Sequence, residues 1–230
     1  MRILIMGDST MQQNFASTYP QVGWPQALPL FLNNKVEILN FARNGCSTKS
    51  FRDLGHFDKL IKEAKVGDYC FIQFGHNDEK QEDPLRYTEP FTTYSANLNQ
   101  YIDELLEVGV TPILLSPIYR RFFEKDGSVS DICHGDYPLA MKQVANERSL
   151  VFIDMTKLTK ELLSLLGDES SKKMYMYFDK GEYNNYIEGK CDNTHLRFHG
   201  AYLISQLFIN ELIKINHPLA SYIKLEVKDE

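Results

Sequence analysis

Short apolar runs alternate with helical patterns along this chain, and this alternation constrains the fold more than any other feature. Turn residues lie at both ends of each apolar run. Between the runs, apolar residues recur at the spacing of an amphipathic helix, most clearly over Thr92–Val108. Such alternation is typical of βα units around a mainly parallel sheet. We predict strands over Arg2–Met6, Val36–Phe41, Tyr69–Phe74, Thr111–Pro117 and Leu150–Asp154. We predict helices over Trp24–Leu32, Asp58–Lys65, Thr92–Val108, Pro138–Arg148, Thr156–Leu166 and Phe198–Ile213.

Size and composition exclude several classes of protein. The chain has 230 residues, of which 43% are hydrophobic, enough to bury the core of one domain over residues 1–230. No apolar run is long enough for a membrane span, and a net charge of −6 argues against non-specific binding of nucleic acid. Strand-like residues begin at Arg2 and leave no room for a targeting signal, so we expect a cytoplasmic protein. The oligomeric state is left open.

The cysteines indicate neither a zinc site nor a disulfide framework. Cys46, Cys70, Cys133 and Cys191 show no C-x-x-C spacing, which argues against zinc. Without a secretion signal we expect them to be free thiols. Cys191 directly precedes Asp192, so we expect it near the chemistry described below.

A serine follows the first predicted strand. The run Ile3–Met6 leads into Gly7-Asp8-Ser9-Thr10, and ligands of open α/β sheets bind at the carboxyl ends of the strands. A tight turn there brings Ser9 near the N-terminus of the next helix, where backbone N–H groups favour developing negative charge. Ser9 is therefore a candidate nucleophile, although Asp and Ser are also ordinary helix caps.

A base and a group to orient it occur together near the other end of the chain. Nucleophilic acyl transfer needs a hydroxyl, a base that takes its proton and a group that orients the base. In Asp192-Asn193-Thr194-His195, we expect a turn or helix start that puts Asp192 and His195 on the same side. Asp192 would hold one imidazole nitrogen while the other faces Ser9. The alternative is a helix cap at Asp192 and a solvent-exposed His195.

Two further loops offer hydrogen-bond donors for an oxyanion. Asn44-Gly45 follows the second predicted strand, where a glycine allows close approach of a substrate. Asn77 follows the third strand and offers a side-chain amide. In a sheet ordered 2-1-3-4-5, the loops after the first three strands are neighbours. The alternatives are a simple turn at Asn44-Gly45 and local backbone capping by Asn77.

A metal site is the competing interpretation of the same loops. Asp8, His76, Asp78, Asp192 and His195 are all of ligand types, as in metal-dependent phosphoesterases. The usual strings of those enzymes, Gly-Asp-x-His and Gly-Asn-His-Asp/Glu, differ from the strings in this chain. No helical His-x-x-x-His spacing occurs either, so we expect no metal and no other cofactor.

The four segments together resemble the SGNH (GDSL-type) hydrolase superfamily, from residue 3 to about residue 200. Finer features are similar to its rhamnogalacturonan acetylesterase branch. The matching segments are Gly7-Asp8-Ser9-Thr10, Asn44-Gly45-Cys46-Ser47-Thr48-Lys49-Ser50-Phe51, Phe74-Gly75-His76-Asn77-Asp78, Gly135-Asp136-Tyr137-Pro138 and Asp192-Asn193-Thr194-His195-Leu196.

The resemblance implies a flavodoxin-like, three-layer α/β/α fold with a five-stranded parallel sheet of order 2-1-3-4-5. It implies Ser9 as nucleophile, His195 as general base and Asp192 as the residue that orients His195. The Ser9 N–H, the Gly45 N–H and the Asn77 side chain would form the oxyanion hole. It implies no metal cofactor.

The function we expect is a serine esterase that removes acetyl groups from plant cell-wall oligosaccharides derived from pectin or rhamnogalacturonan. Such sugars carry carboxylates, and the cations that we expect to attract them are Lys49, Arg120, Arg121 and Arg197; the alternative is that these are solvated loop residues. Long loops over Asp78–Pro90, Tyr119–Asp136 and Met174–Lys190 are placed to carry specificity. Other acyl esters, such as acetylated xylan fragments or lipids, are alternative substrates. A carbohydrate-binding protein with vestigial catalytic residues is the alternative from another class.

Overall fold

Five parallel strands form the centre of the molecule, in the order β2-β1-β3-β4-β5. The computed structural model describes residues 1–224. The strands are β1 (Arg2–Gly7), β2 (Glu37–Asn40), β3 (Tyr69–Gln73), β4 (Thr111–Leu115) and β5 (Val151–Ile153). The predicted fold class and strand order are confirmed.

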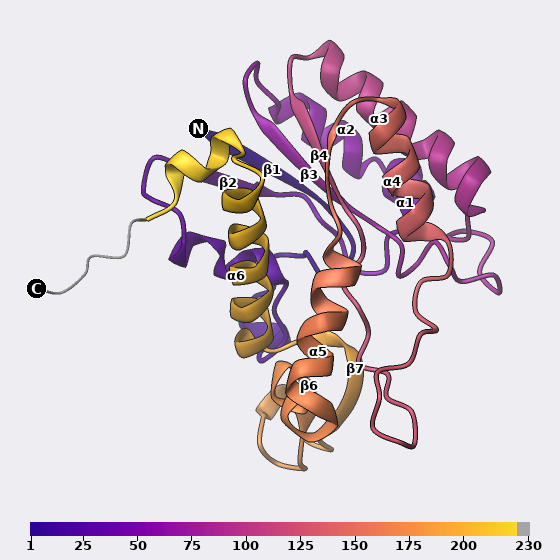
Figure 1. Cartoon of the computed structure of the whole chain (residues 1–230), viewed down its shortest axis with the longest axis vertical. Coiled ribbons are helices and arrows are strands. Elements are labelled where there is room, and N and C mark those ends of the chain that lie inside the picture. The colour runs from indigo at the N-terminus through magenta and orange to yellow at the C-terminus, as the bar shows by residue number, and fades with distance from the viewer. Residues whose placement is uncertain (225–230) are drawn as a thin grey trace, which may run out of the picture.

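Helices cover both faces of the sheet, which gives three layers (Figure 1). Because side chains alternate along a strand, Ile3 and Ile5 pack with α5 (Met155–Ser171) and α6 (Phe198–Lys214). Leu4 and Met6 point to the other face and pack in a second core with the remaining helices. Those helices are α1 (Thr48–Asp53), α2 (His56–Glu63), α3 (Ser95–Glu107) and α4 (Tyr137–Glu147). Burial on both faces explains why the strands read as continuous apolar runs.

Two helical elements differ from what the sequence led us to expect. The predicted helix Trp24–Leu32 is a 3-10 helix, Trp24–Leu30, which contains Pro25 and Pro29. Pro29 lacks the N–H that an α-helical turn requires. The helix α1 was not predicted; its first turn is stabilised by Ser47, whose hydroxyl accepts the Ser50 N–H at 3.1 Å.

A two-stranded antiparallel hairpin lies outside the main sheet, at the lower end of the view in Figure 1. It consists of β6 (Tyr175–Phe178) and β7 (Lys190–Leu196). The prediction of a loop over Met174–Lys190 was therefore wrong for β6. The strand is too short to show the alternation by which longer strands are recognised.

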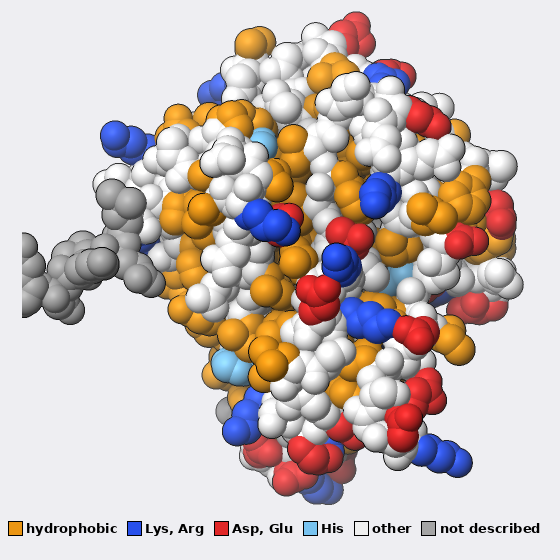
Figure 2. Space-filling model, in the orientation of Figure 1, with side chains coloured by type: hydrophobic (Ala, Val, Ile, Leu, Met, Phe, Trp, Pro, Cys, Tyr) orange, Lys and Arg blue, Asp and Glu red, His pale blue; other side chains and the backbone are white. Residues whose placement is uncertain are grey.

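The remaining elements are short. They are the 3-10 turns Ala16–Thr18, Lys172–Met174, Asn184–Tyr186 and Pro218–Tyr222 and the π-helical turn Pro90–Tyr94. No helix within residues 1–224 combines the length and apolarity needed to cross a bilayer. Figure 2 shows acidic and basic side chains interspersed over one face rather than gathered into a single basic patch.

Candidate active site

Ser9 lies in a tight turn just beyond the carboxyl end of β1. The Met11 N–H donates to the Asp8 carbonyl at 3.2 Å, and the Asp8 side chain accepts the Thr10 N–H and hydroxyl, each at 2.8 Å. Gly7 makes the turn possible, since a Cβ there would lie 2.6 Å from the Gln73 carbonyl oxygen. The local sequence thus holds Ser9 at the predicted edge of the sheet. The prediction that a helix begins there was wrong, because the chain continues as a turn and the next helical element is the 3-10 turn Ala16–Thr18.

Ser9, His195 and Asp192 form a chain of hydrogen bonds. His195 Nε2 lies 3.0 Å from Ser9 Oγ, and His195 Nδ1 lies 2.8 Å from Asp192 Oδ2. Because Nδ1 faces a carboxylate, it carries the proton in neutral imidazole and leaves Nε2 free to accept from the Ser9 hydroxyl. The alternative of a helix cap at Asp192 and a solvent-exposed His195 does not describe this arrangement, in which the His195 side chain is 25% exposed.

A bulge in β7 brings Asp192 and His195 to the same side. Leu196 pairs with Tyr175 while Asp192 pairs with the next residue, Met176, so residues 193–195 have no partners on β6. Asp192 Oδ1 accepts the N–H groups of Thr194 at 2.8 Å and His195 at 3.0 Å, which closes the bulge. The prediction of a turn or helix start over Asp192–His195 was wrong. A bulged strand brings Asp192 and His195 to the same side instead.

The environment of Asp192 favours its ionised form. Burial alone would raise the pKa of Asp192, but the hydrogen bond and charge of His195, with the N–H groups of His195 and Thr194, hold it far below its ordinary value. Lys190 Nζ lies 3.4 Å from Asp192 Oδ2. The carboxylate is therefore charged at neutral pH and can stabilise a protonated His195.

Arg121 is not placed to meet a substrate carboxylate, contrary to its candidate role. It is 6% exposed, forms an ion pair with Asp168 and donates to Ser171 Oγ at 3.0 Å. Its backbone N–H donates to the Asn193 carbonyl at 2.8 Å, and its guanidinium donates to the Asn193 side chain at 3.3 Å. The guanidinium also stacks 4.7 Å above the Tyr177 ring. Arg121 therefore supports the β7 bulge from inside the protein.

The loops after β2 and β3 bring Gly45 and Asn77 together. Asn77 donates from Nδ2 to the Cys46 carbonyl at 2.9 Å and accepts from Arg86 at 3.3 Å, so one amide N–H has no partner in this network. Gly45 has a φ of +75°, a left-handed conformation that favours glycine. Within residues 1–224, the backbone N–H groups of Gly45 and Ser9 donate to no protein acceptor. Three unused donors thus occur in the loops after neighbouring strands.

The remaining candidate cations have different environments. Lys49 is on α1, paired with Asp53 at 2.6 Å. Arg120 forms an ion pair with Glu79 and donates to the His76 carbonyl at 3.1 Å. Arg197 donates to the carbonyls of Tyr175 at 2.9 Å and Lys172 at 3.3 Å. Of the three, only Arg197 makes no ion pair within the described chain.

The four cysteines are free, as expected. Cys191 is exposed on β7 next to Asp192, whereas Cys46, Cys70 and Cys133 are buried.

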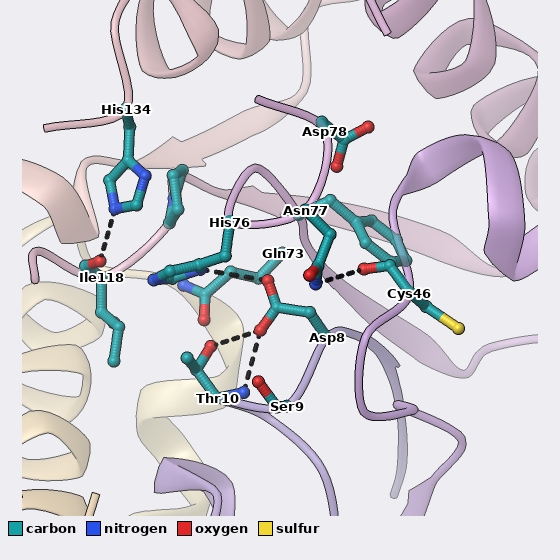
Figure 3. Close-up of polar contacts among 12 residues, drawn as sticks. Asp8, Ser9, Thr10, Cys46, Gln73, His76, Asn77, Asp78, Ile118 and His134 are labelled. Carbon is teal, nitrogen blue, oxygen red and sulfur yellow. Dashed lines mark hydrogen bonds and ion pairs between the residues drawn. The ribbon is translucent and has the colours of Figure 1, made fainter. Parts of the chain in front are cut away.

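A second Asp–histidine pair lies behind Ser9 (Figure 3). His76 Nδ1 is 3.1 Å from Asp8 Oδ2, and both side chains are buried. Burial and nearby positive charge, partly offset by Asp8, lower the pKa of His76 to about 4, so its ring is neutral. Asp78, the other carboxylate in this region, accepts from Thr48 and Thr88 instead. No group of three His, Cys, Asp or Glu side chains suited to a metal ion occurs within residues 1–224.

His134, which the sequence did not single out, packs its ring 4.5 Å from the His76 ring. Its Nδ1 lies 3.1 Å from Glu79 Oε2 and its Nε2 lies 2.8 Å from the Ile118 carbonyl. Both partners are acceptors, so both nitrogens must be protonated. Burial alone would lower the pKa of His134, but interactions with Cys133 and Glu79 raise it to about 9.

The charge on His134 predicts a pH-dependent contribution to stability. Its pKa of about 9 in the folded state exceeds the unfolded value of about 6.5. The stabilisation is thus complete below about pH 6.5 and is lost as the pH rises through 9. We expect the wild-type advantage in unfolding free energy over His134→Asn to shrink between pH 6.5 and 9. Urea unfolding of both proteins measures it; a difference independent of pH would contradict a charged His134. Asn is the matched replacement because it tolerates the φ of 64°.

A parallel sheet with a serine just beyond the carboxyl end of a central strand, hydrogen-bonded to a histidine that an aspartate holds, is typical of α/β serine hydrolases. Residues 3–201 match the family model of GDSL-like lipases and acylhydrolases. The chain belongs to this family and is an esterase, as the resemblance to SGNH hydrolases implied. The family match favours an esterase over the carbohydrate-binding alternative.

Curated relatives match nearly the whole chain. A rhamnogalacturonan acetylesterase of Bacillus subtilis is 32% identical over 223 residues, covering 97% of this chain and 94% of the relative. A probable rhamnogalacturonan acetylesterase of the same organism is 34% identical over 221 residues, covering 96% of each.

Solved structures show the same fold. YxiM of Bacillus subtilis, an uncharacterized esterase, has a TM-score of 0.78 at 24% identity, covering 94% of this chain and 57% of that one. An acetylxylan esterase of Geobacillus stearothermophilus has a TM-score of 0.61 at 15% identity, covering 92% and 93%.

Proposed function

We propose that this esterase removes acetyl groups from plant cell-wall oligosaccharides, with Ser9 as nucleophile, His195 as general base and Asp192 as its orienting partner. The observation that carries the proposal is the hydrogen-bonded chain from Ser9 Oγ through His195 to Asp192. The acetylesterase names of the two Bacillus subtilis relatives support the choice of acyl group.

In the proposed reaction, Ser9 attacks the acetyl carbonyl as His195 Nε2 takes the hydroxyl proton. Asp192 stabilises the imidazolium that forms. Collapse of the tetrahedral intermediate expels the sugar hydroxyl, which receives the proton from His195, and leaves an acetyl group on Ser9. Water, deprotonated by the same imidazole, then releases acetate and restores the serine.

The three unused donors support an oxyanion hole formed by the Ser9 N–H, the Gly45 N–H and the free N–H of Asn77. We expect Asn77→Ala to lower kcat about 100- to 1,000-fold, the usual effect of losing one such donor. Steady-state kinetics on a small acetyl ester measures this effect. The control is Asn146→Ala on α4, and full activity of Asn77→Ala would remove Asn77 from the mechanism.

Arg121 supports His195 indirectly in this proposal, as a positioning residue. Arg121→Met removes its bonds to Asp168, Ser171 and the Asn193 side chain, so we expect kcat to fall about tenfold or more while KM changes little. The low-field proton resonance of His195 Nδ1–H should weaken in the same variant. A change in thermal stability alone, with kcat and the resonance intact, would contradict the positioning role.

As the substrate of this esterase, we favour acetylated pectic oligosaccharides. Acetate release from acetylated rhamnogalacturonan fragments, compared with acetylated xylan fragments, tests this choice. Release only from xylan fragments would keep the mechanism and reject the substrate.

We also propose that the protein is cytoplasmic and acts on imported fragments; fractionation of the source cells tests the location.

A further inference from the structure

Two adjoining hollows form a groove that neither Ser9 nor His195 lines. Both are lined by Tyr19 and Tyr183. The larger has a volume of about 620 Å³ and lies between the loop that follows Ser9 and the loop that joins β6 to β7. The smaller, about 370 Å³, is bounded by Lys173 and the first residues of α6. We refer to the two together as the tyrosine groove.

The walls of the tyrosine groove belong to the segments that carry the proposed catalytic groups. The first wall is the loop that leaves the Ser9 turn and returns to it, since the Trp24 N–H donates to the Thr10 carbonyl at 2.8 Å. The second wall is the hairpin whose strand β7 carries His195. Asn185 Nδ2 joins the walls by donating to the carbonyls of Ala16 at 2.7 Å and Tyr19 at 2.9 Å.

The larger hollow has the chemistry of a sugar-binding surface. Phe15 and Tyr19 expose 72% and 59% of their surfaces, and apolar ring faces are suited to the C–H faces of sugar rings. The side-chain amides of Gln21 and Asn184 line the same hollow and make no hydrogen bond within residues 1–224. Free amides beside exposed rings can bind hydroxyl groups and orient a sugar.

The smaller hollow is basic. Lys173 and Arg197 line it together with His199, and no Asp or Glu does; the one carboxylate that lines the groove, Glu182, belongs to the larger hollow. Neither Lys173 nor Arg197 has a carboxylate within 4.0 Å in the described part of the chain, although the protein as a whole has a net charge of −6. The Arg197 guanidinium is held in place by the Tyr175 and Lys172 carbonyls. Unpaired cations in a hollow favour an anionic ligand.

We propose that the tyrosine groove binds an acidic oligosaccharide, with a uronate carboxylate at Lys173 and Arg197 and neighbouring sugar rings against Tyr19 and Tyr183. This inference rests on the proposed function and names the feature of the substrate that the groove selects, its negative charge. Lys49, Arg120 and Arg121 do not take this role because carboxylates of the protein already pair with them.

The test is binding of unacetylated oligogalacturonate to Ser9→Ala by isothermal titration calorimetry, with a neutral xylooligosaccharide of equal length for comparison. We expect tighter binding of the acidic sugar, and weakening by about fivefold or more when Lys173→Glu is added, since an exposed ion pair is lost and a repulsion gained. The matched control is Lys142→Glu, an exposed lysine on α4 that should leave binding unchanged.

Equal affinity for the two sugars, or unchanged oligogalacturonate binding in Lys173→Glu, would overturn the inference. Failure of the proposed function would look different: the wild-type protein would not release acetate from a small activated acetyl ester, whatever the groove binds.

Discussion

Ser9→Ala is expected to abolish ester hydrolysis, with a fall in kcat of about a millionfold, as when the nucleophile of a Ser-His-Asp triad is removed. Ser9 Oγ is the atom 3.0 Å from His195 Nε2, so alanine leaves the imidazole without a hydroxyl to deprotonate. Initial rates on a small acetyl ester and acetate release from the oligosaccharide both measure the loss.

The Ser9→Ala protein should remain folded, because the bonds that close the turn are made by Asp8, Thr10 and Met11 rather than by the Ser9 side chain. Unchanged thermal unfolding therefore accompanies the lost activity. Ser164→Ala, an exposed serine on α5, is the matched control and should keep the wild-type rate. Residual activity above about 1% in Ser9→Ala would rule out the serine mechanism.

Asp192→Asn is expected to lower kcat about 10⁴-fold, as in other triads with this substitution. Asparagine can still accept the Thr194 and His195 N–H groups at Oδ1, so the bulge is kept. Its amide replaces the carboxylate oxygen that holds His195 Nδ1–H at 2.8 Å, which favours the wrong tautomer and removes the charge that stabilises imidazolium. Kinetics at several pH values measure the effect, with Asp103→Asn on α3 as control.

Asp192→Asn should also change the pH dependence of stability. Because the folded-state pKa of Asp192 lies below the unfolded value of about 3.9, its contribution is complete above that pH. The contribution is lost as the pH falls toward the folded-state pKa. The advantage of the wild type over Asp192→Asn should therefore shrink steadily as the pH falls below about 3.9, and an advantage that stays constant between about pH 5 and pH 2 would contradict an ionised Asp192.

Much of the architecture could be predicted because the information is local. Strands buried on both faces need continuous apolar runs, and the helices between them need amphipathic spacing. The turn at Gly7 and Ser9 could be placed as well, since it follows directly from the end of β1.

The hairpin and the partners of its bulge could not be predicted in this way. The register that leaves residues 193–195 unpaired depends on β6, a strand of four residues without a recognisable period. Arg121 resembles an exposed loop cation in the sequence, and only its contacts with Asp168 and Asn193 show that it is buried. His134 has no motif around it; its position is defined by Glu79 and Ile118.

The local sequence was thus sufficient to predict the parallel sheet, the polar loops at the carboxyl ends of its strands and the types of residue in those loops. The geometry that makes those residues a site came from folding, because Ser9 and His195 are 186 positions apart and meet at 3.0 Å. The same holds for Arg121 and Asn193, 72 positions apart. Residue type and short-range spacing specify strands, helices and turns, whereas hydrogen-bond geometry between distant segments depends on how those elements pack.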